Sequence, residues 1–362
     1  MARGQRETNQ HQMTPTWGVV MTVNEPQTLI LSNVKWHLAT GATEVRVYLD
    51  DPDDPVAASL NCIDGCHVTR CDAVYWARHR GKRQRPASQM RRQTLNANMA
   101  KRQSKADWLF HIDADEFIWQ DSPLAAELAH ITAPQTEVNL PVLERLFADQ
   151  RPQAHLFDGV FRATADLDVA DAQSAYAPFA TFMKRGQYSH GAGKGGVRVD
   201  DPLRLGVHNA TVQQGDTWRR SARHVSTAAR LLHFDGVTPL HWLIKVLRYR
   251  QTPWEVQKAI LQPHRAGQIE WMIDQSTDMD AARAAHADLF AATPQRCAQL
   301  DAFDLLHNVP FDPRIVLGND APDLSVAAFD ADLLARNDWF RGLMPTLGRP
   351  PPPTRMFLGA LT

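Results

Sequence analysis

Short apolar runs and longer segments of helical pattern alternate along the first third of the chain. The apolar runs, rich in β-branched residues, lie at 17–23, 44–49, 108–112 and, more weakly, 67–74. Runs of this length and composition are typical of strands that are buried on both faces. Helical pattern fills much of the sequence between them, from Pro26 to about residue 40 and from 88 to 105. This alternation predicts βαβ units and a largely parallel sheet covered by helices, which is an α/β fold.

The pattern changes twice further along the chain. Short candidate strands separated by long polar loops occur at 138–143, 179–184, 203–207 and 230–234. After Thr238-Pro239 the sequence is helical to about residue 306. Prolines 350 to 353 can form neither a helix nor a paired strand. We therefore expect a loose tail over 1–16, an α/β domain over 17–236, a helical C-terminal region over 237–348 and a proline-rich tail over 349–362.

Composition and charge exclude several classes of protein. Of 362 residues, 44% are apolar and 22% are charged, which is ordinary for a globular chain and wrong for a disordered one. The net charge of −1 argues against binding nucleic acid through overall charge, and we expect no nucleic-acid partner. No apolar run approaches the roughly 20 residues that span a bilayer, and residues 1–16 lack the hydrophobic stretch of a secretory signal. Four cysteines make no disulfide framework, so we expect a cytoplasmic protein.

The most informative motif is the acidic sequence that follows the run at 108–112. Asp113, Asp115 and Glu116 stand at the end of a strand, where ligands bind in parallel sheets. Like charges at such a position repel one another unless a cation lies between them. Carboxylate oxygens suit Mg²⁺ or Mn²⁺, which keep coordination positions for substrate phosphates. An isolated Asp-x-Asp is more often an acidic turn or a helix cap, but the apolar strand before it favours a metal site here.

Six motifs occur in a fixed order between about residues 17 and 250. They are Thr22-Val-Asn-Glu25, Tyr48-Leu-Asp-Asp51, Arg92-Gln93, the segment 106–117, His190-Gly-Ala-Gly-Lys194 and Leu231-Leu-His-Phe234. This ordered set resembles the nucleotide-diphospho-sugar glycosyltransferases of the GT-A fold, and more narrowly their bacterial family 2-like branch related to family 92. The resemblance implies a Rossmann-like, mixed but mostly parallel sheet flanked by helices. It also implies a catalytic domain over 17–236, with a nucleotide-sugar half over about 17–120 and an acceptor half over about 121–236.

The resemblance implies roles for individual residues. Asp113, Asp115 and His233 match the residues that hold the metal, Mn²⁺ or Mg²⁺. Taken alone, His233 would more often be a structural histidine, and only its place in the ordered set favours a ligand. The positions that match contacts to the donor are Asn24, Glu25, Asp50, Arg92, Gln93, Asp113 and Lys194. Relatives often carry Ser after the Gly-Lys pair, whereas Gly195 follows Lys194 here and brings no hydroxyl.

Transfer of a sugar needs groups on both sides of the reacting carbon. A metal on the phosphate oxygens and a cation such as Lys194 would stabilise the leaving nucleoside diphosphate. The acceptor hydroxyl needs a general base, typically Asp or Glu. Glu144, which follows a candidate strand, is the first candidate, and Asp166 and Asp168 are alternatives. Inversion at the sugar carbon is implied by the resemblance alone.

Two other motifs have simpler interpretations. The segment 191–196 fails the P-loop pattern, because position 188 is Tyr and Gly195 follows the lysine. A cluster that suggests zinc lacks the usual second pair of ligands, and we interpret its cysteines as packed beside a strand. That cluster comprises Cys62, Cys66, His67 and Cys71.

Two basic segments leave alternatives open. Residues 78–92 hold seven Lys or Arg and no acid. They fit a solvated loop and helix start, or a site for the donor diphosphate, an anionic acceptor or lipid head groups. Residues 240–250 are apolar with basic and aromatic positions, which fits a core-facing helix with a cationic outer face or a helix on a membrane surface.

The sequence therefore predicts a metal-dependent, hexosyltransferase-type enzyme, cytoplasmic or peripheral on the inner face of the membrane. Its substrates would be a nucleotide-diphosphate sugar and a saccharide or lipid-linked acceptor, and its role the synthesis of surface polysaccharide or glycoconjugate. One alternative is a nucleotidyltransferase or other metal-phosphate enzyme that uses the same carboxylates. Another is a non-catalytic protein that binds nucleotide sugars or a membrane surface.

Overall fold

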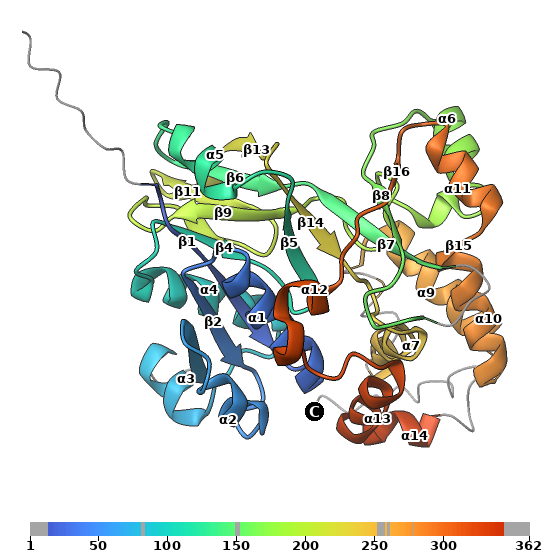
Figure 1. Ribbon diagram of the computed structural model, residues 1–362, viewed down its shortest axis with the longest axis horizontal. Helices are drawn as coiled ribbons and strands as arrows, with labels where there is room; N and C mark the ends of the chain where they lie inside the picture. The colour runs from blue at the N-terminus through green and yellow to red at the C-terminus, as the bar shows by residue number, and fades with distance from the viewer. Residues whose placement is uncertain are drawn as a thin grey trace, which may run out of the picture.

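The main sheet of the protein is mixed and mostly parallel, as predicted. The computed structural model describes residues 14–80, 84–148, 153–251, 258, 261–276 and 278–343. Within them a seven-stranded sheet has the order β13-β6-β9-β4-β1-β2-β3 (Figure 1). Its strands are β1 (Trp17–Val23), β2 (Glu44–Leu49), β3 (Cys66–Arg70), β4 (Trp108–His111), β6 (Thr136–Leu140), β9 (Lys194–Arg198) and β13 (Ala222–Val225). The pairs β1–β2, β2–β3, β1–β4 and β13–β6 are parallel, and β9 is antiparallel to both neighbours.

A second sheet meets the main sheet at the acidic motif. Its order is β16-β8-β7-β14-β5, with β15 paired to β7, and a separate sheet has the order β10-β11-β12. The bounds are β5 (Glu116–Gln120), β7 (Val142–Ala148), β8 (Val160–Ala163), β10 (Arg204–Leu205), β11 (Ala210–Gln214), β12 (Thr217–Arg220), β14 (Ala229–His233), β15 (Ala291–Ala292) and β16 (Leu306–His307). Strand β4 of the main sheet passes into β5 of the second sheet through Asp113, Ala114 and Asp115. The acidic motif therefore connects the two sheets.

Helices cover both faces of the main sheet. The helices are α1 (Gln27–Ala39), α2 (Val56–Leu60), α3 (Ala73–Arg80), α4 (Gln89–Gln103), α5 (Leu124–His130), α6 (Val169–Tyr176), α7 (Pro239–Leu247), α9 (Pro263–Gln275), α10 (Met279–Phe290), α11 (Pro294–Asp301), α12 (Pro313–Leu317), α13 (Val326–Arg336) and α14 (Asp338–Leu343). Val19 and Met21 of β1 lie in the same core cluster as α1, whereas Val20 packs with Ala97 of α4. Since alternate residues of β1 are buried on opposite faces, the strand is apolar throughout.

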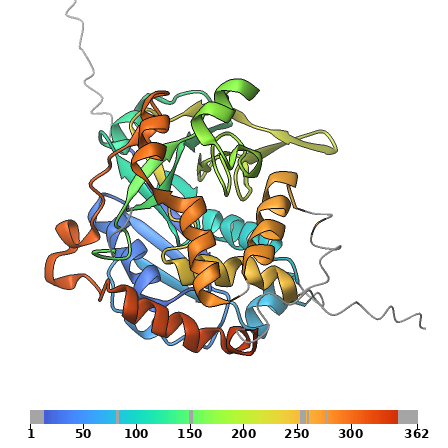
Figure 2. The ribbon, with the colours of Figure 1, turned by 90° about the vertical axis from the view of Figure 1, so that its right-hand side faces the viewer.

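The C-terminal helices pack onto the α/β part of the chain (Figure 2). One hydrophobic cluster includes residues from Trp17 of β1 to Phe340 of α14. Polar contacts join the same parts, because Asp332 accepts a hydrogen bond from the Gln27 backbone N–H and Arg336 pairs with Asp54 at 2.7 Å. The predicted boundary between 236 and 237 therefore falls within a continuous core, and the domain division stays a prediction.

Several local expectations differ from the structure. The weak strand at 67–74 ends at Arg70, and α3 follows it. Residues 179–184 form a short 3₁₀ turn at Ala180–Phe182 instead of a strand. Thr16, expected in a loose tail, is hydrogen-bonded through its hydroxyl and its backbone N–H to Asp107. Residues 1–13 and the proline-rich segment 349–362 lie outside the described residues. In the described part of the chain, no helix is both long enough and apolar enough to cross a bilayer.

Candidate functional site

A cleft opens at the carboxyl ends of β1, β2 and β4. Strand β1 is paired with β2 on one side and β4 on the other, so the strand order reverses direction there, and open α/β sheets bind ligands at such a switch point. The cleft has a volume of about 870 Å³. Eight of the residues expected at the site line it: Asn24, Glu25, Asp50, Arg92, Gln93, Asp113, Asp115 and His233. The structure thus brings these residues together from motifs spread over more than 200 positions of the sequence.

Asp113 is held from both sides by the protein itself. Its Oδ1 accepts a hydrogen bond of 2.6 Å from the Gln93 side chain, and its Oδ2 pairs with Lys194 Nζ at 2.6 Å. Burial would raise the pKa of Asp113, but the Lys194 ammonium and His111 together lower it. Lys194, expected to contact the donor, is fully buried and does not line the cleft. Its ammonium also lies 3.3 Å from Glu116, so its positive charge offsets the negative charges of both Asp113 and Glu116.

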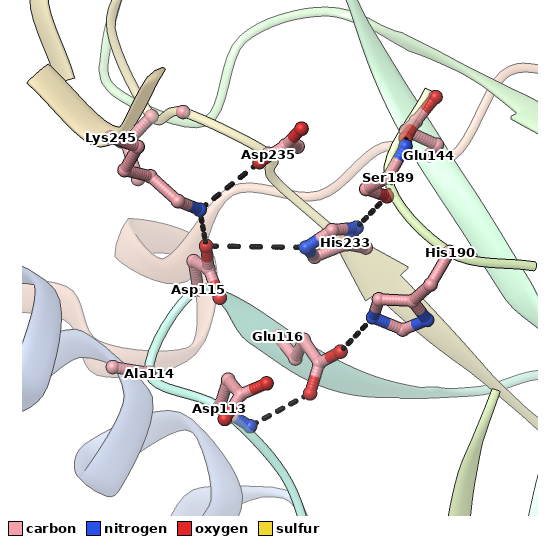
Figure 3. A network of polar contacts seen from close by, with 12 residues as sticks. Asp113, Ala114, Asp115, Glu116, Glu144, Ser189, His190, His233, Asp235 and Lys245 are labelled. Carbon is pink, nitrogen blue, oxygen red and sulfur yellow. Dashed lines mark hydrogen bonds and ion pairs between the residues drawn. The ribbon is translucent and has the colours of Figure 1, made fainter. Parts of the chain in front are cut away.

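Asp115 belongs to a separate network on the other side of the turn (Figure 3). Its Oδ2 lies 2.7 Å from Lys245 Nζ and 4.0 Å from His233 Nε2. Lys245 also contacts Asp235 at 3.1 Å, and Arg265 contacts the other oxygen of Asp235 at 3.2 Å. Burial would raise the pKa of Asp235, but Arg265 and Lys245 hold it well below its usual range. Asp113 and Asp115, predicted to share one metal, therefore each pair with a different lysine.

Three residues could hold a metal ion among those that the structure describes. They are Glu116, His190 and His233, whose ligand atoms all lie within 4.8 Å of one another. Glu116 Oε1 is 3.1 Å from His190 Nε2, and Glu116 Oε2 accepts from the Asp113 backbone N–H at 2.7 Å (Figure 3). A set of one carboxylate and two imidazoles fits Mn²⁺ better than Mg²⁺, which favours oxygen ligands alone.

The turn that carries these acids is fixed by α1. The Asn33 side-chain amide donates to the carbonyl oxygens of Ala114 at 3.1 Å and Glu116 at 2.7 Å. Both residues that flank Asp115 are therefore tied to a buried helix, and the acidic side chains keep their places relative to the sheet.

Two arginines hold Asp50 at the end of β2. Arg92 contacts both carboxylate oxygens, at 2.7 and 2.8 Å, and Arg85 adds a third contact of 2.7 Å. All three residues line the cleft, so part of the basic segment 78–92 faces the site, while residues 81–83 lie outside the described residues. Glu25 lies 3.1 Å from His241 Nε2 at the same edge.

None of the three carboxylates considered as a general base lines the cleft. Glu144 is fully buried and ion-paired with Arg162, and it accepts hydrogen bonds from the Tyr188 N–H and from the N–H and hydroxyl of Ser189. Burial would raise the pKa of Glu144, but Arg162 lowers it. Asp166 pairs at the surface with Arg185, and Asp168 caps α6 by accepting from the Asp171 N–H. These positions do not suit a base that faces an acceptor in this cleft.

Sequence reasoning missed several residues of the site. Glu116 belongs to the predicted acidic motif and His190 opens the motif at 190–194, but neither was expected to bind a metal, and Ser189 directly precedes that motif. The carboxylate and the imidazole within these motifs are the signal that points to Glu116 and His190. Lys245 and Arg265 come from helices that only the fold brings to the cleft. Helix α7, which carries Lys245, has six buried residues and packs in the core, as expected for one of the two interpretations of 240–250. It does not lie on the surface as a membrane-bound helix would.

The two motifs that failed their functional patterns, the segment 191–196 and the cysteine cluster, have structural explanations. Residues 194–198 form β9 between β4 and β6, and Lys194 ends in the protein interior instead of a phosphate-binding loop. Cys71 is buried, and burial raises the pKa of the Cys66 and Cys71 thiols to about 12.

Comparison with known proteins gives a distant likeness of fold and no family. No family model and no curated protein matches the sequence. The structure of GalNAc-T7 with UDP, GalNAc and Mn²⁺ matches with a TM-score of 0.33 and 9% identity, over 69% of this chain and 52% of that chain. HddC from Yersinia pseudotuberculosis matches with a TM-score of 0.32 and 8% identity, over 60% and 93%. S. aureus TarS 1–349 matches with a TM-score of 0.29 and 11% identity, over 92% and 88%.

This chain thus spans about half the length of the GalNAc-T7 chain. At these TM-scores and identities the likeness is distant, and it assigns neither a family nor a function. A relation to the family 92 branch is not shown.

Proposed function

We propose that this protein is a metal-dependent glycosyltransferase that moves a sugar from a nucleotide-diphosphate donor to a hydroxyl of a saccharide or lipid-linked acceptor. The observation that supports this most is the gathering of eight motif residues around one cleft at the switch point of the main sheet. The cleft volume of about 870 Å³ is within the range of sites for ligands of this size. We extend the proposal to a cytoplasmic enzyme of surface polysaccharide or glycoconjugate synthesis.

The proposal gives different tasks to different parts of the cleft. Asp50 and Asp113 follow strands with β1 between them, so they are about 10 Å apart along the sheet edge, two strand spacings. In this arrangement the nucleoside lies toward Asp50, and the diphosphate lies toward Asp115, Lys245 and Arg265. The cationic side chains Lys245 and Arg265 would stabilise the negative charge that the leaving diphosphate acquires. A divalent cation bound there would add Lewis-acid stabilisation of the same oxygens.

Binding of the diphosphate can be tested separately from turnover. We expect UDP or GDP to raise the thermal unfolding midpoint more with Mn²⁺ than without it, because the ion joins the phosphates to the carboxylates. The Asp115→Ala variant should lose the Mn²⁺-dependent part of this shift, and its fold should persist because Lys245 keeps Asp235 as a partner. The matched control is Asp166→Ala, whose carboxylate is exposed and outside the cleft. An unchanged shift in Asp115→Ala would contradict the proposal.

Turnover distinguishes the proposed activity from its alternatives. With a panel of nucleotide sugars and acceptors, we expect release of nucleoside diphosphate that depends on the acceptor. Release of inorganic pyrophosphate from a nucleoside triphosphate would show a nucleotidyltransferase instead. Binding of a nucleotide sugar without turnover on any acceptor of the panel would show a binding protein.

A further inference from the structure

We propose that the metal ion of this cleft is held by Glu116, His190 and His233, beside Asp115 and not on Asp113, with Ser189 and Glu144 as positioning residues. The inference deepens the proposed function, since it specifies the ligands of the metal that the function requires. It concerns metal binding by the chain alone, however, and can be tested without any nucleotide or sugar.

Both carboxylate oxygens of Asp113 already have partners within the protein. Gln93 and Lys194 occupy both of its carboxylate oxygens at 2.6 Å, and Lys194 is a fully buried ammonium with no route to solvent. A metal ion on Asp113 would have to displace one of these partners, whereas Lys194 contacts Glu116 through Oε2 and leaves Oε1 to face His190. Asp113 therefore acts as the counter-ion of Lys194.

Glu116 and His190 are spaced like two neighbouring ligands of one ion. Oε1 of Glu116 and Nε2 of His190 are 3.1 Å apart. Two neighbouring ligands of one ion, with bonds of about 2.1 Å at a right angle, are about 3 Å apart. His233 completes a group whose ligand atoms all lie within 4.8 Å of one another, so small movements of the side chains would bring all three onto one ion.

A hydrogen-bond relay from Glu144 through Ser189 orients the ring of His233. Glu144, ion-paired with Arg162, can only accept hydrogen bonds, so the Ser189 hydroxyl must donate its single proton to Glu144 Oε1 at 2.6 Å. The Ser189 oxygen then accepts from His233 Nδ1, which is 2.9 Å away. With the proton of Nδ1 directed at Ser189, Nε2 of His233 is the ring nitrogen that faces Asp115 and the cleft, where it can offer its lone pair to a metal (Figure 3). Metal-binding histidines are commonly oriented by such a partner on the other nitrogen.

The donor set predicts which ion binds. Two imidazoles and one carboxylate favour divalent transition metals, whereas Mg²⁺ prefers oxygen ligands. We therefore expect Mn²⁺ and Co²⁺ to compete for one site, and Mg²⁺ to displace Mn²⁺ only at a concentration at least about 100-fold higher.

The test is a titration of the full chain, freed of metal with a chelator, with Mn²⁺ followed by electron paramagnetic resonance. We expect one bound ion per chain, at least about tenfold weaker binding in His190→Gln and His233→Gln, and binding within about threefold of wild type in Asp113→Asn. His224→Gln is the matched control, because His224 also lies 3.0 Å from a glutamate, Glu127, but belongs to no group of three ligands among the described residues. Thermal unfolding of each metal-free variant checks that it folds.

The relay has its own variants. Ser189→Ala should weaken Mn²⁺ binding by about 10- to 100-fold, and Ser189→Thr, which keeps the hydroxyl, should restore most of it. A merely structural role of Ser189 would lower the unfolding midpoint without a change in the Mn²⁺ affinity of the folded protein. Loss of binding in Asp113→Asn with full binding in His190→Gln would overturn the inference and leave the proposed function standing. Absence of Mn²⁺ binding to the wild-type chain would also overturn it.

Discussion

His37 is a buried side chain whose two ring nitrogens have opposite roles. Its Nδ1 donates to the Asn33 carbonyl at 2.8 Å, and its Nε2 accepts from the Ile118 backbone N–H at 3.1 Å. The ring also stacks on Phe117. Burial lowers the pKa of His37 to about 4. Protonation of Nε2 would remove the bond to Ile118, so the folded protein holds this histidine neutral.

The neutral state of His37 gives a prediction for acid stability. Between pH 6.5 and about 4 the unfolded chain takes up a proton at this residue and the folded chain does not, so the free energy of unfolding decreases as the pH falls. The contribution lost is roughly 3 kcal/mol. In His37→Gln, whose amide can donate and accept in the same way, we expect the decrease between pH 7 and pH 4 to be smaller by that amount. Urea unfolding at a series of pH values measures it, and equal decreases in both proteins would contradict the prediction.

Residue types at strand ends could be predicted from the sequence, but their partners could not. Asp50, Asp113 and Asn24 follow apolar strands, and parallel strands bring their carboxyl ends to one edge, so the gathering of these residues follows from local pattern. Glu144 has the same local pattern, a carboxylate beside a candidate strand. In the structure, however, it is buried and ion-paired with Arg162 of the neighbouring strand β8. Only the pairing of β7 with β8 shows that Glu144 is part of a buried ion pair and is not a base that faces substrate.

In strand β9, near the site, the close approach of the neighbouring strand β4 leaves no room for a side chain at one position. At Gly196 a Cβ atom would lie 2.4 Å from two ring atoms of Phe110 on the neighbouring β4. Phe110 is fully buried and packs edge-on against Trp17, so its ring has little room to move. The glycines after Lys194, which fail the P-loop pattern, are thus explained at Gly196 by the close approach of two strands.

Substitution at Gly196 tests this close approach. We expect Gly196→Ala to lower the free energy of unfolding by about 1–3 kcal/mol, because the methyl group forces Phe110 or the strand to shift. The control is Gly342→Ala, where a Cβ atom meets nothing within 4 Å. Denaturant unfolding of both variants measures the difference, and a Gly196→Ala protein as stable as wild type would show that Phe110 yields at no cost.

Across the whole molecule, segments far apart in sequence share one core. Phe329 and Phe340 near the C-terminal end of the described chain lie in the same cluster as Val19 of β1. Helices α7 and α9 to α14 lie in the region after residue 236, but a helical sequence pattern does not indicate which surface a helix will cover. The packing of α13 on the α/β part, through Arg336 and Asp54, therefore had to come from the structure.

A shared core predicts a single unfolding transition. We expect Phe329→Ala to lower the free energy of unfolding by about 3–5 kcal/mol, the cost of a large cavity at a fully buried site. Within each protein, tryptophan fluorescence and far-ultraviolet circular dichroism should report the same urea midpoint. The midpoint of the variant should be lower than that of the wild type. Two separated transitions, with only the later one unchanged in Phe329→Ala, would instead support an independent C-terminal domain.

The rim of the cleft includes Thr22 near one end of the chain and Arg336, Asn337 and Trp339 near the other. A ribosome makes the chain from its N-terminus, and the first strands can form while the rest is still being added. The cleft cannot be complete until residue 339 has left the ribosome and α13 has packed. A nascent chain would therefore carry its acidic turn without the finished pocket, and a ligand that needs the whole rim could bind only after α13 has packed.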